Sequence, residues 1–235
     1  MKIAIIPARG GSQRIKNKNI ADFLGRPIIA YALEAAKDSG LFDKIHVSTD
    51  SDEIISVTEE LGYRVDFKRL QELADNHTGI VPVLKWVIER YAKDGMNFED
   101  ICCIMPAAPL LESEDLIKAY KIYEQQGKKP LLVAAKLPVP VEWSFRRDAN
   151  GVLTPAMPQA LQIRSQDLQK AYYEAGPFSY FHRSYVLGQN KEEGVKFLSY
   201  LIPLERAVDI DDPEDLELAK TLYLGRLALK KVEIV

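Results

Sequence analysis

Short apolar runs alternate with longer helical patterns along most of the chain, and this alternation limits the possible folds more than any other feature. The apolar runs are rich in Ile, Val, Leu and Phe and have the length of buried strands. Strands that alternate with helices of this length predict a Rossmann-like α/β fold, with a mostly parallel sheet and helices on both faces. The predicted strands span residues 2–6, 44–48, 101–105, 131–135 and 178–182.

Helical patterns fill the intervals between these strands. Pro27 suits the first turn of a helix that begins near Arg26, and Gly40 suits its end. The chain has 235 residues, 47% of them apolar, which is enough for one domain with a sizeable core. We therefore expect residues 1–235 to form a single domain. Further helices are predicted over residues 51–62, 80–93 and 114–126, and a last one begins after Asp212.

Residues 137–160 interrupt the alternation. They contain four prolines, an Asp-Ala-Asn-Gly turn and only short apolar pieces. This pattern predicts a hairpin-like arm that leaves the sheet, with Trp143 and Phe145 available to a partner. We expect it to be the dimerisation arm of a homodimer; the alternative is a surface excursion without a partner.

The overall charge, the N-terminal segment and the cysteines indicate which partners and which cellular compartment to expect. A net charge of −3 and a pI near 5.8 argue against a general nucleic-acid coat, so we expect no nucleic-acid partner. The apolar run at the N-terminus is too short for a signal peptide or a membrane span. Cys102 and Cys103 are adjacent and would point to opposite faces of a strand, as expected for reduced thiols. We therefore expect a cytoplasmic protein with no membrane contact.

A basic loop follows the first predicted strand although the chain as a whole is slightly acidic. In residues 5–19, IIPARGGSQRIKNKN, the adjacent Gly10 and Gly11 let backbone amides approach a phosphate closely. The loop is neither a Walker loop nor a Gly-x-Gly-x-x-Gly dinucleotide fingerprint, and by itself it could be a solvated basic turn. Its cations are Arg9, Arg14, Lys16 and Lys18.

Paired carboxylates lie near the other end of the chain, in the stretch VDIDDPEDLELA. On an extended strand, Asp209 and Asp211 face the same side and suit an Mg²⁺ ion that also holds substrate phosphates. Asp212 precedes Pro213 and is better read as a helix N-cap. A basic loop together with such a pair favours phosphoryl or nucleotidyl transfer over simple anion binding. The alternative makes all three aspartates part of a helix start.

Five segments, in this order, carry a family resemblance that covers residues 1 to about 225. The chain resembles the acylneuraminate cytidylyltransferases, which are CMP-sugar synthetases. The stretch IRSQDLQKAYYEAGPFSYF is similar to the branch of the family that acts on pseudaminic acid. The five segments are PARGGSQRIKNKNI, VSTDS, ELADN, PAAPLL and VDIDDPEDLELA.

The resemblance implies a nucleotidyltransferase that transfers CMP from CTP to the anomeric hydroxyl of a nine-carbon α-keto sugar acid and releases pyrophosphate. It implies Mg²⁺ on Asp209 and Asp211, catalytic roles for Arg9, Lys18 and Asp211, and a partner's arm that completes the sugar side. The implied nucleotide-binding residues are Ala8, Arg9, Gly10, Gly11, Ser12, Lys18, Asn19, Asp75 and Pro106. The implied sugar-binding residues are Arg164, Gln166, Asp167, Tyr172 and Glu174.

Two departures from the family pattern and three alternatives accompany this interpretation. Gln13 replaces the usual Lys, for which Arg14 could substitute, and Pro106-Ala107-Ala108-Pro109 lacks both usual hydroxyls. The acceptor could instead be N-acetylneuraminate, legionaminate or Kdo. The chain could also be a sugar-1-phosphate nucleotidyltransferase, although the Asp-x-Asp pair fits that class less well. It could finally be a nucleotide-binding module without catalysis.

Overall fold

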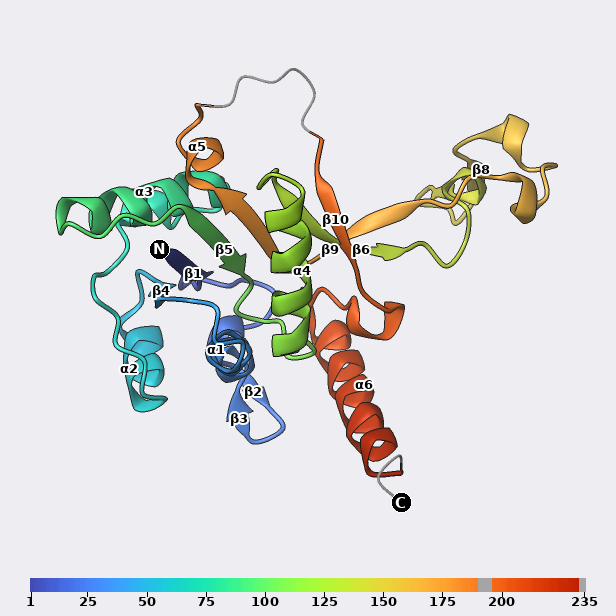
Figure 1. Ribbon diagram of the computed structural model, residues 1–235. Coiled ribbons are helices and arrows are strands. Elements are labelled where there is room, and N and C mark those ends of the chain that lie inside the picture. The colour runs from blue at the N-terminus through green and yellow to red at the C-terminus, as the bar shows by residue number, and fades with distance from the viewer. Residues whose placement is uncertain (190–195, 233–235) are drawn as a thin grey trace.

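One six-stranded sheet forms the centre of the computed structural model, which describes residues 1–189 and 196–232 (Figure 1). The strand order is β10-β6-β9-β5-β1-β4. Only β9 runs antiparallel to its neighbours among these six strands. The predicted fold, a mostly parallel sheet, is thus confirmed. The bounds are β1 Lys2–Pro7, β4 Lys44–Ser48, β5 Asp100–Ile104, β6 Leu131–Lys136, β9 Tyr172–His182 and β10 Leu198–Leu201.

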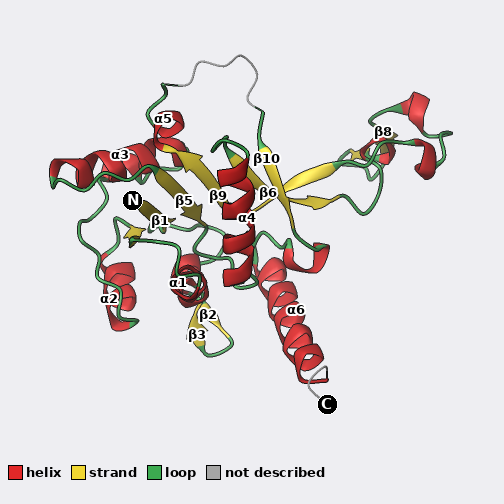
Figure 2. Ribbon diagram, in the orientation of Figure 1, coloured by secondary structure: helices red, strands yellow, loops and turns green. Residues whose placement is uncertain are grey.

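Helices cover both faces of the sheet because its strands are apolar on both sides (Figure 2). Along β1, Ala4 and Ile6 pack into the cluster that contains α1 and α4, whereas Ile3 and Ile5 pack against α3 and α5. None of the helices within the described ranges is both long and apolar enough to cross a membrane. Their bounds are α1 Ile29–Asp38, α2 Asp52–Glu60, α3 Ile80–Lys93, α4 Ser113–Gln125, α5 Arg183–Val186 and α6 Pro213–Val232.

The start of α1 differs from the prediction. Arg26 and Pro27 form the short strand β3, paired with β2 at Asp22–Phe23, so Pro27 does not open the helix. Leu24 and Gly25 connect the two strands with φ values of 55° and 84°. Two successive positive φ values define the tight turn that joins antiparallel strands. This turn, rather than the apolar pattern, decides where α1 begins.

The arm is longer than the sequence indicates. Strand β9 starts at Tyr172, which pairs with Lys136 at the end of β6, so the whole of residues 137–171 is inserted between two paired strands. It projects away from the helices beyond the sheet (Figure 1). Within it, β7 (Phe145–Arg147) and β8 (Leu153–Pro155) form a two-stranded ribbon. The remaining short elements are 3₁₀ turns at Lys18–Ile20, Gln71–Leu73, Val141–Trp143, Pro158–Ala160, Ser165–Asp167 and Leu204–Arg206.

His46 is a fully buried histidine on β4. Its Nδ1 lies 3.0 Å from the hydroxyl of Tyr91, which donates a hydrogen bond to Asp66. Burial lowers the pKa of His46 from 6.5 to about 3, against the opposing effect of the Asp66 charge. The imidazole is therefore neutral in the folded protein, while the unfolded chain takes up a proton below pH 6.5.

We predict that the folded state loses stability as the pH falls below about 6.5. In this pH range His46 binds a proton in the unfolded state but stays neutral in the folded state. This difference lowers the free energy of unfolding by about 2 kcal/mol between pH 7 and pH 5. Urea titrations at both pH values measure this. His46→Phe should flatten the dependence; an unchanged slope in the variant would show that other groups cause it.

Candidate active site

A cavity of about 430 Å³ lies at the carboxyl ends of β1 and β5, where the loops that follow these strands meet. This is the edge at which open α/β sheets bind ligands. The cavity brings together side chains that are up to about 200 positions apart in sequence. Of the predicted residues it contains Arg9, Ser12, Lys18, Asn19, Asp75, Pro106, Asp209 and Asp211.

The loop after β1 is held by side chains from two other segments. The Gly10 amide donates to Asp50 Oδ1 at 2.8 Å, and Asn19 Nδ2 donates to the carbonyl of Arg9 at 2.9 Å. A Cβ on Gly10 would lie 3.2 Å from Ser51 Cβ, and Gly11 has a φ of +74°. Glycine is therefore favoured at Gly10 by the close approach and at Gly11 by the backbone conformation.

Two of the predicted nucleotide-binding residues use their backbone amides in hydrogen bonds within the protein. The Gly10 amide is engaged by Asp50, so it is not free to cradle a phosphate as predicted. Ala8 is fully buried, and its amide donates to the carbonyl of Ser48 at 2.9 Å. Gly10 and Gly11 line a smaller cavity next to Arg9, on the side of Asp50 and His77.

Two cations of this loop reach the aspartates that precede α6. Lys18 Nζ donates to the Ile210 carbonyl at 2.6 Å and lies 3.2 Å from Asp211 Oδ1. Arg14 Nη2 lies 2.9 Å from Asp211 Oδ2. The basic loop and the carboxylates therefore form one site, as the sequence predicts.

The aspartate segment is extended but is not part of the sheet. Ile210 is 1% exposed and packs with Phe23 and Ile28, while Asp209 and Asp211 on either side of it both line the cavity. The two carboxylates thus share a face, as predicted, but the predicted strand there is wrong. The segment instead lies outside the strands and leads directly into α6.

The environment separates the pKa values of the two carboxylates. Partial desolvation between the cavity walls and the nearby Asp211 charge raise the pKa of Asp209, although its side chain is exposed at the cavity mouth. Desolvation also acts on Asp211, but hydrogen bonds from Lys18 and Arg14 outweigh it and hold the pKa of Asp211 below its usual range. Asp211 is therefore ionised and already paired with cations.

Asp212 is the N-cap of α6, which confirms the role predicted for it. Its Oδ1 accepts from the amides of Glu214 at 2.9 Å and Asp215 at 3.0 Å. In return, Asp215 Oδ2 accepts from the amides of Asp211 at 2.9 Å and Asp212 at 3.0 Å. This reciprocal arrangement satisfies amides at the helix start and fixes the backbone that carries Asp211.

A buried ion pair anchors the same segment from its other end. Arg206, three residues before Asp209, forms an ion pair with Asp115 at the start of α4 and lies 3.2 Å from Glu112. Asp115 is 4% exposed and also accepts from the hydroxyl of Tyr200 at 2.9 Å. The aspartate segment is therefore tied to α4 before it reaches the cavity.

Two residues of the site escaped the sequence analysis. Arg69 is 5% exposed, donates to Ser48 Oγ at 3.0 Å and to the Ser48 carbonyl at 2.6 Å, and lines the cavity. Burial lowers the pKa of Arg69 to about 10. Asn76 accepts from Arg9 Nη1 at 2.5 Å. The available signal was an arginine three residues before the motif ELADN, in a stretch without predicted structure.

Asp75 shapes the loop that carries Asn76. Its Oδ1 accepts from the amides of His77 at 2.7 Å and Thr78 at 2.6 Å, just before α3. These backbone hydrogen bonds lower the pKa of Asp75. Asp75 thus lies in the cavity as predicted, with one carboxylate oxygen used to order the turn.

The predicted sugar-binding residues lie on the arm and at the base of β9, outside this cavity. Arg164 Nε lies 2.8 Å from Asp167 Oδ2 in an exposed ion pair, and Gln166 lines a separate cavity of about 340 Å³. Tyr172 and Glu174 stand at the start of β9, paired with β6. A single chain therefore does not bring the sugar-binding residues to the predicted nucleotide-binding residues.

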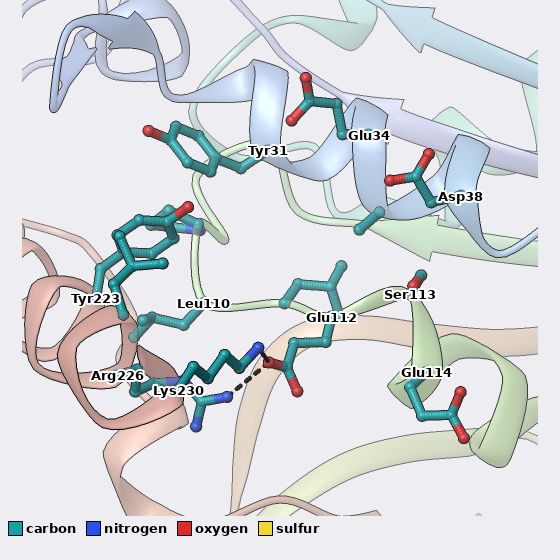
Figure 3. Close-up of a pocket in the computed structure, with 14 residues that line it drawn as sticks. Tyr31, Glu34, Asp38, Leu110, Glu112, Ser113, Glu114, Tyr223, Arg226 and Lys230 are labelled. Carbon is teal, nitrogen blue, oxygen red and sulfur yellow. Dashed lines mark hydrogen bonds and ion pairs between the residues drawn. The ribbon is translucent and has the colours of Figure 1, made fainter. Parts of the chain in front are cut away.

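A further cavity of about 430 Å³ lies between α1, the start of α4 and α6 (Figure 3). Arg226 and Lys230 of α6 converge on Glu112, at 2.6 and 2.7 Å from its Oε1. Tyr31 of α1 lines the cavity at some distance from these ion pairs and packs against Tyr223 of α6. None of the predicted site residues lies in this cavity, and its ion pairs fasten α6 to the segment before α4.

Comparison with known proteins places the chain in a family. The sequence model of that family, described as Cytidylyltransferase, matches residues 3–234. The chain belongs to the cytidylyltransferase family. The two pseudaminic acid cytidylyltransferases of Campylobacter jejuni, from serotypes O:2 and O:23/36, are 37% and 38% identical to it, over 94% of this chain and 95% of each relative.

More distant relatives agree with this placement. The N-acylneuraminate cytidylyltransferase of Escherichia coli is 28% identical over 94% of this chain and 51% of that protein. The solved structure of CMP:2-keto-3-deoxy-manno-octonic acid synthetase in complex with CTP superimposes with a TM-score of 0.72, over 96% of this chain and 99% of that chain, at 14% identity. At that identity the likeness supports the fold alone.

We predict that Arg206→Met costs about 3–5 kcal/mol of unfolding free energy, because it leaves the buried Asp115 carboxylate without its cation. Urea unfolding measures this. The control is Arg90→Gln, which removes the exposed Arg90–Asp94 pair on α3 and should cost only about 0.5 kcal/mol. Equal losses of unfolding free energy in the two variants would mean that the buried Arg206–Asp115 pair contributes no more to stability than an exposed pair.

Proposed function

We propose that this cytidylyltransferase transfers CMP from CTP to the anomeric hydroxyl of a nonulosonic acid, with pseudaminic acid as the acceptor, and releases pyrophosphate. The observation that carries the proposal is the single cavity in which Arg9, Arg14 and Lys18 face Asp209 and Asp211. Pseudaminic acid is preferred because the two relatives named for it match this chain at 37% and 38% identity over nearly their full length.

The cations are proposed to hold the triphosphate of CTP. Arg9 and Lys18 stabilise the charge of the departing pyrophosphate, and Arg14 takes the place of the lysine that Gln13 replaces. The buried Arg69 guanidinium has hydrogen bonds to Ser48 but no ion pair with any residue of the described ranges, so its charge favours an anionic or carbonyl-bearing ligand. This cation-lined cavity fits the nucleotide half of the reaction.

Asp209 and Asp211 are proposed to hold Mg²⁺. Mg²⁺ is usually bound by one or two carboxylates together with substrate phosphates and water, so two aspartates that face a phosphate cavity fit it. When bound, the ion would neutralise charge on the α-phosphate and lower the pKa of the attacking hydroxyl. Asp211 would accept the proton of that hydroxyl, directly or through a water molecule. The reaction is an in-line displacement without a covalent enzyme intermediate.

The arm is proposed to complete the sugar half of the site across a homodimer. Its apolar side chains are exposed in one chain; Phe145 is 48% and Leu153 58% exposed. The indole nitrogen of Trp143 is buried without a hydrogen-bond partner among the described residues. A partner's arm would bring Arg164, Gln166 and Asp167 to the acceptor, whose carboxylate needs a cation.

The reaction is proposed to take place in the cytoplasm. Cys102 and Cys103 are both buried free thiols, as suits a reducing compartment. The CMP-sugar would then serve bacterial surface glycans or flagellin glycosylation.

We predict that Asp211→Ala lowers turnover at least about 100-fold with the fold intact, because the cavity loses a proposed metal-binding carboxylate. Pyrophosphate release from CTP and Mg²⁺ is measured with pseudaminic, N-acetylneuraminic and legionaminic acids and Kdo, of which pseudaminic acid should react fastest. Asp212→Asn, one residue along, keeps an N-cap side chain and should retain activity. Near-normal turnover of Asp211→Ala would refute the metal assignment.

We predict that the purified protein is a dimer at micromolar concentration in light scattering, and that Leu153→Glu makes it monomeric. A charge placed in an apolar contact is strongly unfavourable once desolvated. The matched control is Thr154→Glu, which adds the same charge to the opposite face of β8. A monomer in the unmodified protein would exclude the proposed sharing of the arm.

A further inference from the structure

Each oxygen of the Asp211 carboxylate is contacted by a cation of the loop after β1. Arg14 Nη2 lies 2.9 Å from Oδ2, and Lys18 Nζ lies 3.2 Å from Oδ1. Their positive charges oppose the approach of a metal ion to the same carboxylate. Because Asp211 belongs to the proposed metal pair, the inference that follows rests on the proposed function.

Lys18 has more contacts than Arg14 and is less exposed. Lys18 is only 20% exposed and also donates to the Ile210 carbonyl at 2.6 Å. Arg14 is 64% exposed, and Asp211 is its single ion-pair partner within the described residues. An exposed pair of this kind changes an equilibrium constant by no more than about fivefold. Arg14 is therefore the partner that can leave Asp211 easily.

Arg14 also lines the cavity that contains Arg9 and Ser12, where the triphosphate is proposed to bind. Phosphate oxygens offer a guanidinium the same bidentate, charge-assisted geometry as a carboxylate. Because Arg14 lines this cavity and also contacts Asp211, the triphosphate and Asp211 can compete for its side chain.

We propose that Arg14 is a positioning residue that occupies Asp211 in the nucleotide-free enzyme and moves to the triphosphate when CTP binds. The nucleotide then uncovers the carboxylate that binds the metal ion, so that metal and nucleotide favour each other's binding. Such coupling is reciprocal between the two ligands. Removal of Arg14 should strengthen metal binding in the absence of nucleotide and weaken nucleotide binding in the absence of metal.

The test compares Arg14→Gln with Lys16→Gln, a matched control on the same loop. Lys16 is exposed and has no ion pair within the described part of the chain, so both variants lose one positive charge but only the first frees Asp211. Mn²⁺ binding without nucleotide is followed by the electron paramagnetic resonance of free Mn²⁺. CTP binding is measured by calorimetry in EDTA.

The expected result is Mn²⁺ binding about two- to fivefold tighter in Arg14→Gln than in wild type, with little change in Lys16→Gln. CTP binding without metal should weaken about three- to tenfold in Arg14→Gln only. Equal Mn²⁺ affinities in the two variants would overturn the role of Arg14, because the charge of the loop would then explain the effect. A third variant, Asp209→Asn, separates the two proposals: unchanged Mn²⁺ binding in it refutes the metal site itself.

Discussion

The contact between Lys18 and the backbone and side chain at Ile210–Asp211 is the interaction on which the site depends. It joins the loop after the first strand to the segment before the last helix, 192 positions later in the sequence. Together with the more exposed Arg14–Asp211 pair, it is the direct link between the loop cations and the carboxylates. The hydrogen bond to the Ile210 carbonyl holds Lys18 in place whether or not Asp211 binds another partner.

The rest of the structure holds the two halves of this contact in position. On one side, Asp50 and Asn19 fix the glycine loop through its backbone. On the other, the Arg206–Asp115 ion pair and the capping carboxylate of Asp215 fix the aspartate segment at both ends. These groups are polar and partly or fully buried, so each one stabilises a single backbone arrangement. The side chains that are proposed to bind ligands therefore stand on a backbone held at several points.

Side chains of both charges line the cavity before any ligand binds. Arg14 and Lys18 keep Asp211 ionised, while Asp209 is less readily ionised than usual. A nucleotide brings negative charge to the cations, and a divalent ion brings positive charge to the aspartates. In the proposed reaction, the nucleotide and the metal ion would together replace an internal ion pair.

The alternation of strands and helices determined the fold class, and residue types at fixed spacing determined the loop cations, the N-cap at Asp212 and the aspartate pair, because these are local properties of the chain. Tertiary structure alone decided that the Gly10 amide is taken by Asp50, that Arg69 enters the cavity, and that the arm extends to Ala171. Each of these depends on a partner far away in the sequence. The residues proposed for the sugar half lie on the arm and at the start of β9, and the fold of one chain leaves them apart from the cavity proposed for the nucleotide.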